Sequence, residues 1–330
     1  MKSPRILVIR KDNIGDLVCT TPLFARLRAR FPEAFIAALV TEYNTPVLTG
    51  NPHLDAVYSY QKAKHRHENE SWLGVYARRA ALFFRLRRMK FDWILLPGGP
   101  HPSALRAARV LNPGQTIVRT QTPPGAHEVF CVLACAAALE IDDATPPPPT
   151  RVIPDRRLMA TLPPLPHDGR RPIGVHISAR KPPQRWPVER FITLIGALHE
   201  RGERVLLFWS PGAADNPLHP GDDDKARQIL QAVGELAVTP MPTRALPELI
   251  AGLARCQAVI CSDGGAMHLA AGLGKPIVCL FGNSDARRWH PWGPRYQLLQ
   301  PASHQVGEIS TAELLNAFDL LMARHDHEIH

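Results

Sequence analysis

The chain has 330 residues, of which 45% are hydrophobic and 21% are charged, a globular composition that excludes a mainly disordered protein and suits two domains. No apolar run approaches the roughly 20 residues that a membrane-spanning helix needs, and the first residues do not resemble a secretory signal, so we expect a cytoplasmic protein. The formal net charge of +9 indicates an anionic partner, and nucleic acid, anionic lipid and phosphorylated small molecules are all open at this point.

The first half of the chain begins with a predicted strand over residues 5–10, a glycine-containing loop and an amphipathic helix that ends before Pro32. The runs AFIAALV, AVYSY and DWILLPGG predict three further strands. No CxxC pair occurs among the six cysteines, which we expect to be buried thiols rather than metal ligands or disulfides.

A basic amphipathic helix is predicted over residues 72–88. Eleven lysines and arginines lie between residues 61 and 110, against three acidic residues. Such a helix can lie on an anionic membrane or meet a phosphorylated acceptor, for which we single out Arg78, Arg85 and Arg88. The alternative is a helix that packs by its aromatic side and leaves its arginines in solvent.

A proline-rich stretch at about 143–172 resists regular structure and predicts a linker between domains 1–165 and 166–330. A strand near 173–178 and a helix from about 188 to 201 follow it. Strands are then predicted from RVLLFWS, AVICSD and PIVCLFG, with helices from ARQILQAVG, LPELIAGLARC and MHLAAGLG between them. Short apolar strands that alternate with helices predict parallel sheets, in two similar α/β domains that face each other across a cleft.

Ligands of parallel α/β sheets bind in the loops that follow the strands. The loop Arg10–Asp16 lacks both the GxGxxG dinucleotide fingerprint and the P-loop pattern, but it places Asp16 at the start of a helix. Asp16 is therefore either a general base or a helix cap.

A second loop, C-S-D-G-G-A-M-H-L-A-A at residues 261–271, follows a predicted strand and opens a helix. Gly264 and Gly265 allow a ligand to approach the backbone, and the helix start offers free N–H groups to an anion. Asp263 could cap this helix, with His268 one turn further on; a plain capped helix is the alternative.

A third segment, residues 178–187, holds three cations within six residues after a strand, which suits a diphosphate, although a solvated basic loop fits as well. The three aspartates at residues 222–224 predict the start of a helix, because acidic side chains are favourable at a helix N-terminus. No pair of aspartates sits at a strand end in the manner of a metal site, so we expect no metal.

Taken together, the IGD loop, the RWP segment and the block SDGGAMHLAAGLGKPIVCLFG resemble glycosyltransferase family 9, the ADP-heptose:lipopolysaccharide heptosyltransferases. The resemblance implies a GT-B fold with two Rossmann-like domains, the acceptor on the first and the nucleotide sugar on the second. It also implies an inverting reaction without a metal or other cofactor, with ADP-heptose as the co-substrate and a phosphorylated lipid-linked saccharide as the acceptor.

The same resemblance assigns roles to individual residues. Asp16 matches the general base, and we add Lys11 and the three helix arginines as acceptor contacts. The positions that correspond to donor-binding residues are Ser178, Arg180, Lys181, Gln184, Arg185, Asp222, Asp263, Gly264, Gly265 and His268. Gln184 departs from the family, which usually has lysine there, and we expect Arg180 or Lys181 to supply the missing charge.

Other functions are also compatible with parts of the sequence. A nicotinamide-dependent oxidoreductase would need the missing glycine fingerprint, and no nucleic-acid-binding module is recognisable, so we expect no nucleic-acid partner. A sugar-nucleotide-binding protein without turnover and a family member that uses a different nucleotide sugar remain as alternatives.

Overall fold

The computed structural model describes residues 3–61, 71–120, 122, 124–141, 145–165, 171–216, 221–234, 236 and 238–326, with side chains as far as residue 323. The chain divides into two compact units, Met1–Ile153 and Pro154–His330. This division lies inside the proline-rich stretch 143–172 and before the expected boundary at 165/166, because the short helix α7 (Arg156–Thr161) packs against α10 (Leu246–Ala254) of the second unit.

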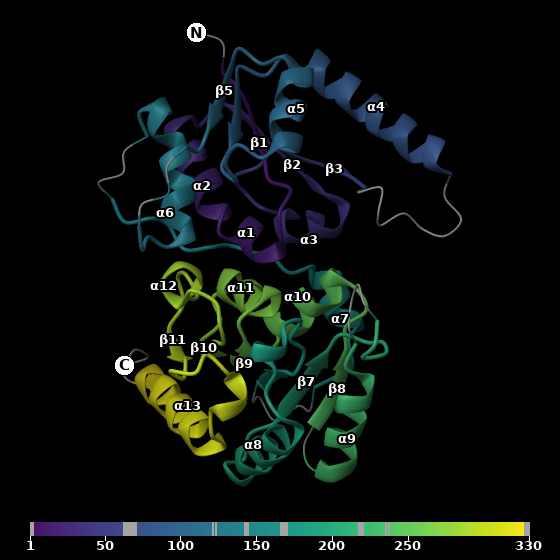
Figure 1. The fold of residues 1–330 in the computed structure, drawn as a ribbon, viewed down its shortest axis with the longest axis vertical. Helices are drawn as coiled ribbons and strands as arrows, with labels where there is room; N and C mark the ends of the chain where they lie inside the picture. The colour runs from purple at the N-terminus through teal and green to yellow at the C-terminus, as the bar shows by residue number, and fades with distance from the viewer. Residues whose placement is uncertain are drawn as a thin grey trace. The chain divides into compact units, whose positions relative to one another are not determined.

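The first unit is built on a five-stranded parallel sheet in the order β3-β2-β1-β4-β5. Figure 1 shows α4 and α5 on one side of it and α2 and α6 on the other. The strands are β1 (Arg5–Ile9), β2 (Phe35–Thr41), β3 (Ala56–Tyr60), β4 (Trp93–Leu96) and β5 (Gln115–Val118). The helices are α1 (Ile14–Val18), α2 (Thr21–Arg30), α3 (Thr45–Leu48), α4 (Trp72–Arg88), α5 (Pro102–Leu111) and α6 (Glu128–Leu133).

The second unit has a six-stranded parallel sheet in the order β11-β10-β9-β6-β7-β8. The strands are β6 (Ile173–His176), β7 (Val205–Trp209), β8 (Val238–Pro242), β9 (Ala258–Ser262), β10 (Ile277–Leu280) and β11 (Tyr296–Leu299). Besides α10, the helices are α8 (Val188–Glu200), α9 (Asp223–Val233), α11 (Gly265–Gly272), α12 (Ala286–Trp289) and α13 (Thr311–Asp326).

In both sheets, the first strands of the unit are added in one direction across the sheet, and the later strands are added on the other side of the first strand. This switch lies between β1 and β4 in the first unit and between β6 and β9 in the second. Loops that leave the carboxyl ends of such strand pairs diverge and leave room for a ligand. The loops that the sequence singles out therefore follow the strands at which each sheet switches.

The predicted parallel sheets are confirmed, with three strands that the sequence pattern did not reveal: β5, β8 and β11. β8 has the sequence VTPMP, and its two prolines are tolerated because the strand lies at the sheet edge. The single helix expected before Pro32 is instead two, α1 and α2. Pro22 lies in the first turn of α2, and the Thr20 and Thr21 hydroxyls donate to the carbonyls of Asp16 and Val18.

Each unit has its own apolar core, and all six cysteines are buried and unpaired, as expected. Burial raises the pKa of the Cys135 thiol to about 11 and that of Cys256 to about 12, so these thiols are not reactive thiolates at neutral pH. No helix in the described part of the chain combines the length and apolarity needed to cross a membrane.

Candidate functional site

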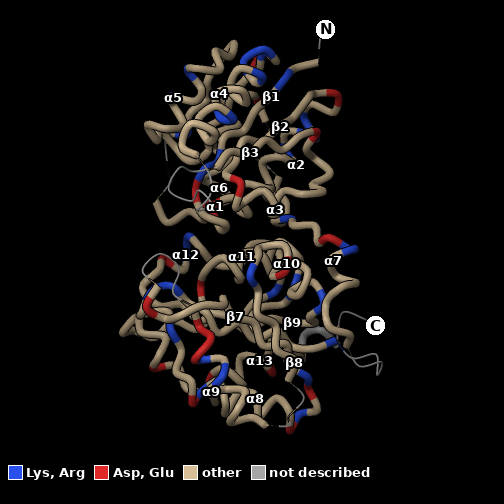
Figure 2. The backbone as a smooth tube through the Cα atoms, turned by 90° about the vertical axis from the view of Figure 1, so that its right-hand side faces the viewer, with Lys and Arg blue, Asp and Glu red and all other residues tan. Residues whose placement is uncertain are grey.

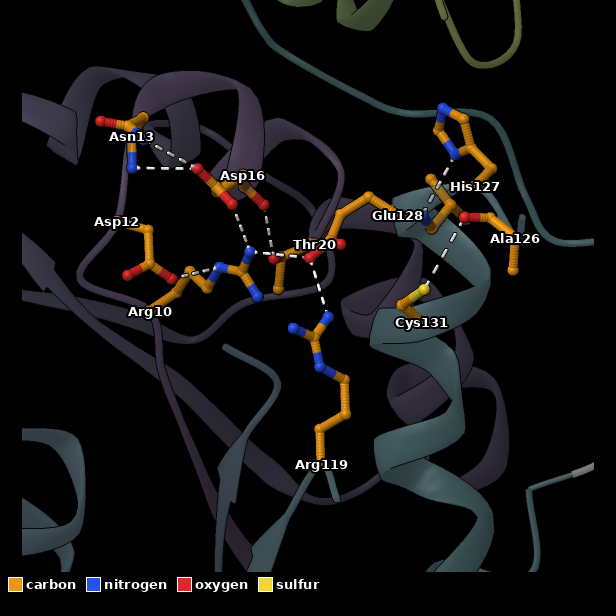
Figure 3. Close-up of polar contacts among 11 residues, drawn as sticks. Arg10, Asp12, Asn13, Asp16, Thr20, Arg119, Ala126, His127, Glu128 and Cys131 are labelled. Carbon is orange, nitrogen blue, oxygen red and sulfur yellow. Dashed lines mark hydrogen bonds and ion pairs between the residues drawn. The ribbon is translucent and has the colours of Figure 1, made fainter. Parts of the chain in front are cut away.

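Asp16 lies in the first turn of α1, and both of its carboxylate oxygens accept hydrogen bonds (Figure 3). Oδ1 accepts from Arg10 Nη2 at 2.7 Å. Oδ2 accepts from the backbone N and the side-chain Nδ2 of Asn13, both at 3.2 Å, which is long for a hydrogen bond. The carboxylate remains 17% exposed, so Asp16 secures the start of α1 and still presents a charged oxygen to solvent.

Arg10 is the buried cation that orients this carboxylate. Its side chain is only 2% exposed, yet it also pairs with Asp12 at 2.9 Å and with Glu128 at 2.9 Å. Burial opposes the positive charge, but the three carboxylates outweigh it and raise the pKa of the guanidinium. No local sequence motif indicates the pairing of Arg10 with Glu128, because 118 residues separate the two along the chain.

Lys11 lines a pocket of about 300 Å³ at the carboxyl ends of β1 and β4. Its Nζ donates to the Ser103 carbonyl at 3.1 Å and lies 5.2 Å from the centre of the Tyr60 ring. The guanidinium of Arg79 also lies over that ring, at 5.0 Å. Two cations therefore gather at Tyr60, one of the pocket's walls, and the arginine that α4 contributes there is Arg79 rather than one of those predicted.

The predicted arginines Arg78, Arg85 and Arg88 lie on the exposed surface of α4 and do not line this pocket. α4 buries only Val75 and Leu86. Several large apolar side chains of the helix face solvent instead: Trp72 is 47% exposed, Leu73 81%, Tyr76 53% and Phe84 63%. The alternative of a helix packed by its aromatic side is therefore wrong for these three aromatic residues, but it holds for Phe83, which packs against the core of the first unit.

In the second unit, Gln184 and Asp263 lie together although 79 residues separate them in the sequence. Gln184 is buried, and its Nε2 donates to Asp263 Oδ2 at 2.8 Å and to Ser284 Oγ at 3.0 Å. These two bonds use both hydrogens of the amide. Burial raises the pKa of Asp263, while Ser284 and the charge of Lys181 act in the opposite direction. Gln184 thus holds Asp263 rather than presenting its N–H groups to a ligand.

The predicted cap at the start of α11 is wrong, because Gly264 rather than Asp263 is the N-cap residue and has no side chain with which to cap the helix. A Cβ added to Gly264 would meet no described atom within 4 Å, so internal packing does not explain a glycine there. Gly265 begins the helix. His268 is buried in it, and its ring lies 6.0 Å from Trp289, edge to face.

Lys225 on α9 holds the backbone of the basic segment 178–187 through hydrogen bonds just before its start and near its end. Its Nζ donates to the carbonyls of Ile177 and Trp186, each at 3.0 Å. Arg180, Lys181 and Arg185 are exposed on the loop between them. The Ser178 hydroxyl accepts from Ser210 N at 2.9 Å, and Asp222 N donates to the Ser210 carbonyl, also at 2.9 Å. Five of the predicted donor-binding residues, Gln184 included, thus share one loop, and Asp222 lies next to it through Ser210.

Two parallel-sheet α/β units with charged loops at their switch points define the architecture of GT-B glycosyltransferases. A crystal structure of a family 9 glycosyltransferase from Veillonella parvula superposes with a TM-score of 0.81, at 20% identity over 98% of this chain and 99% of that one. Escherichia coli ADP-heptose LPS heptosyltransferase II gives a TM-score of 0.77, at 19% identity over 98% and 99%.

Residues 115–313 match glycosyltransferase family 9 (heptosyltransferase), and the chain belongs to this family. Among named relatives, lipopolysaccharide heptosyltransferase 3 of Escherichia coli is 26% identical over 303 residues, which cover 84% of this chain and 83% of the relative. The protein is therefore a glycosyltransferase.

Lys225 leads to a pH-dependent prediction. Burial lowers the pKa of its ammonium from the ordinary 10.5 to about 8. Between these values the unfolded chain binds more protons at Lys225 than the folded chain, so this residue's contribution to the free energy of unfolding rises with pH. Denaturant unfolding of the wild type and of Lys225→Met should show a stability difference that grows in favour of the wild type from pH 8 to 10.5. A difference independent of pH would contradict this assignment.

Proposed function

We propose that the protein transfers heptose from ADP-heptose to a phosphorylated, lipid-linked saccharide of the lipopolysaccharide type, by an inverting reaction that needs no metal. The observation that carries the proposal is the Asp16 carboxylate, held by Arg10 and still exposed at the switch point of the first sheet. Membership of the heptosyltransferase family supports the sugar and the acceptor class. The solved heptosyltransferase neighbour that is named for ADP-heptose supports the donor.

The chemistry is a single displacement at the anomeric carbon. An oxygen of Asp16 accepts the proton of the acceptor hydroxyl as that hydroxyl attacks, and the bond to the nucleotide diphosphate breaks on the opposite side. One displacement inverts the configuration. Oδ2 suits the proton transfer better than Oδ1, because its two bonds from Asn13 are longer than the 2.7 Å bond from Arg10 to Oδ1.

The second unit would bind the donor and stabilise the leaving diphosphate. Arg180 and Lys181 bring exposed positive charge to the loop that Lys225 secures. The start of α11 adds backbone N–H groups that its N-cap residue, a glycine, does not cap, next to the open space at Gly264. Cations and N–H groups can stabilise a departing diphosphate in place of a metal ion, which is why we propose metal-independent transfer.

The first unit would bind the acceptor and contact an anionic membrane from the cytoplasmic side. Lys11 faces the pocket beside the Asp16 loop, where it suits a phosphate or carboxylate of the acceptor. α4 carries basic residues and no acidic ones (Figure 2). Its exposed apolar side chains and its arginines together match a lipid surface with negative headgroups, where a lipid-linked acceptor resides.

Two alternatives predict different measurements. A binding protein without turnover would bind the nucleotide sugar and release no nucleotide diphosphate when the acceptor is present. A family member with another donor would turn over with a nucleotide sugar other than ADP-heptose. A screen of binding and transfer across nucleotide sugars separates both alternatives from the proposed reaction.

Asp16→Asn tests the general base. The amide cannot take the hydroxyl proton, so transfer should fall by about two to four orders of magnitude. Binding of ADP, measured by calorimetry, should stay close to that of the wild type, because the donor contacts lie in the other unit. Near-normal turnover in this variant would refute the role of Asp16.

Donor affinity in Arg180→Ala and Lys181→Ala tests the source of the charge that Gln184 lacks. Loss of the true phosphate partner should cost about 1.5–3 kcal/mol of donor binding, as expected for a charge-assisted hydrogen bond. Arg201→Ala, in an exposed ion pair with Asp319, is a control with the same change of charge. If neither loop variant weakens donor binding while Gln184→Lys greatly strengthens the binding of ADP-heptose, then Arg180 and Lys181 do not supply the missing charge. That result would indicate a donor other than ADP-heptose.

Vesicle binding tests the surface of α4. Leu73→Ser with Phe84→Ser should reduce partitioning onto anionic vesicles, and charge reversal of Arg78, Arg85 and Arg88 should reduce it most at low salt. Leu320→Ser on α13, where Leu320 is 51% exposed, is the matched apolar control. Donor binding should not change. Equal partitioning of the wild type and all variants would show that α4 is only a solvated face.

A further inference from the structure

Glu128 is a buried carboxylate at the first position of α6, with a side chain only 1% exposed. Its Oε1 accepts from Arg10 Nη2 and from Arg119 Nη1, both at 2.9 Å. A buried charge is strongly unfavourable unless opposite charges pair with it. Glu128 is therefore tied to two guanidiniums, one that follows β1 and one that follows β5.

The Arg10 nitrogen that reaches Glu128 is the same one that reaches Asp16. Nη2 lies 2.9 Å from Glu128 Oε1 and 2.7 Å from Asp16 Oδ1 (Figure 3). It carries two hydrogens, one for each carboxylate. Because the guanidinium is planar, the bond to Glu128 sets the direction in which the other hydrogen points. The orientation of Asp16 thus depends on a residue that does not touch it.

The balance of charge around Arg10 gives Glu128 and Arg119 opposite effects. Three carboxylates, those of Asp12, Asp16 and Glu128, share the guanidinium. Glu128 draws positive charge away from Asp16, while Arg119 neutralises part of Glu128. Without Glu128, the positive charge of Arg10 would act more strongly on Asp16. Without Arg119, Glu128 would attract more of the Arg10 charge, and less of it would act on Asp16.

We propose that Glu128 is a positioning residue for glycosyl transfer: held by Arg119, it shares the Arg10 guanidinium with Asp16, and so both orients that carboxylate and limits how much of the Arg10 charge acts on it. The proposal rests on the proposed function, in which Asp16 is the base. It adds two residues, Glu128 and Arg119, that no sequence motif indicates.

Other titratable groups lie close to this cluster. Burial raises the pKa of the Cys19 thiol, which therefore stays neutral and adds no charge. His127 precedes Glu128, and its Nδ1 accepts from Val129 N at 3.1 Å, so that nitrogen carries no proton. Lys11 points to the Ser103 carbonyl. Asp12, which forms an ion pair with Arg10 Nε, is the neighbour whose charge acts in the same direction as that of Glu128.

The test is the pH dependence of kcat/KM for transfer in Glu128→Gln, Arg119→Met and the double variant. The acidic limb of the profile should move to lower pH in Glu128→Gln, with a lower kcat and little change in the KM for the donor. It should move to higher pH in Arg119→Met. We expect each move to be about one pH unit. The double variant restores the balance of charge and should return the limb close to its original position.

Melting temperatures measured alongside separate positioning from a loss of fold. A purely structural role would lower stability in both single variants and leave the limb in place, or move it in one direction only, and either result overturns the proposal. If Glu128→Gln does not fold, Arg119→Lys decides: it keeps the charge and should keep the limb, whereas Arg119→Met should move it.

Asp16→Asn separates this proposal from the proposed function. If that variant keeps normal turnover, the assignment of the base fails, and the positioning role fails with it. If Asp16→Asn abolishes turnover while the single variants leave the limb unmoved, the base stands and only the role of Glu128 is refuted.

Discussion

The pairing of one central strand with neighbours on both sides is the constraint on which the functional loops depend. β1 pairs in parallel with β2 and β4, and β6 pairs in parallel with β7 and β9. Because strands are added first on one side of the central strand and then on the other, the loops that follow the two strands at this switch diverge at the carboxyl edge of the sheet. The Asp16 loop and the Asp263 loop both arise there, so side chains with charge are placed where a substrate can reach them.

Buried charge then decides how those side chains are held. In the first unit the cation is Arg10, whose burial is compensated by three carboxylates rather than one. In the second unit Lys225 anchors the basic segment through two backbone carbonyls, and burial lowers its pKa to about 8. Both arrangements are sensitive to the loss of a single partner, since an unpaired buried charge is far more costly than a pair exposed to solvent.

Gln184 connects two loops of the second unit without adding a charge. An amide in this place donates to Asp263 and Ser284 and brings no charge of its own. Positive charge near Asp263 then comes from Lys181, on the exposed loop. Under the proposed function, the charge that meets a diphosphate would therefore come from the exposed loop residues Arg180 or Lys181 and not from residue 184.

Much of this protein can be read from its sequence, because periodicity and loop chemistry are local. The apolar runs of β1 and β9, the helix over residues 72–88 and the position of Asp16 at a helix start all follow from neighbouring residues. The edge strand β8 could not be found in this way, because its prolines are acceptable only at a sheet edge. Nor could the pairing of Arg10 with Glu128 or of Gln184 with Asp263, since each joins residues that only the order of the strands brings together. The sequence determined which chemical groups are present, and the tertiary structure decided which of them form ion pairs or hydrogen bonds with one another.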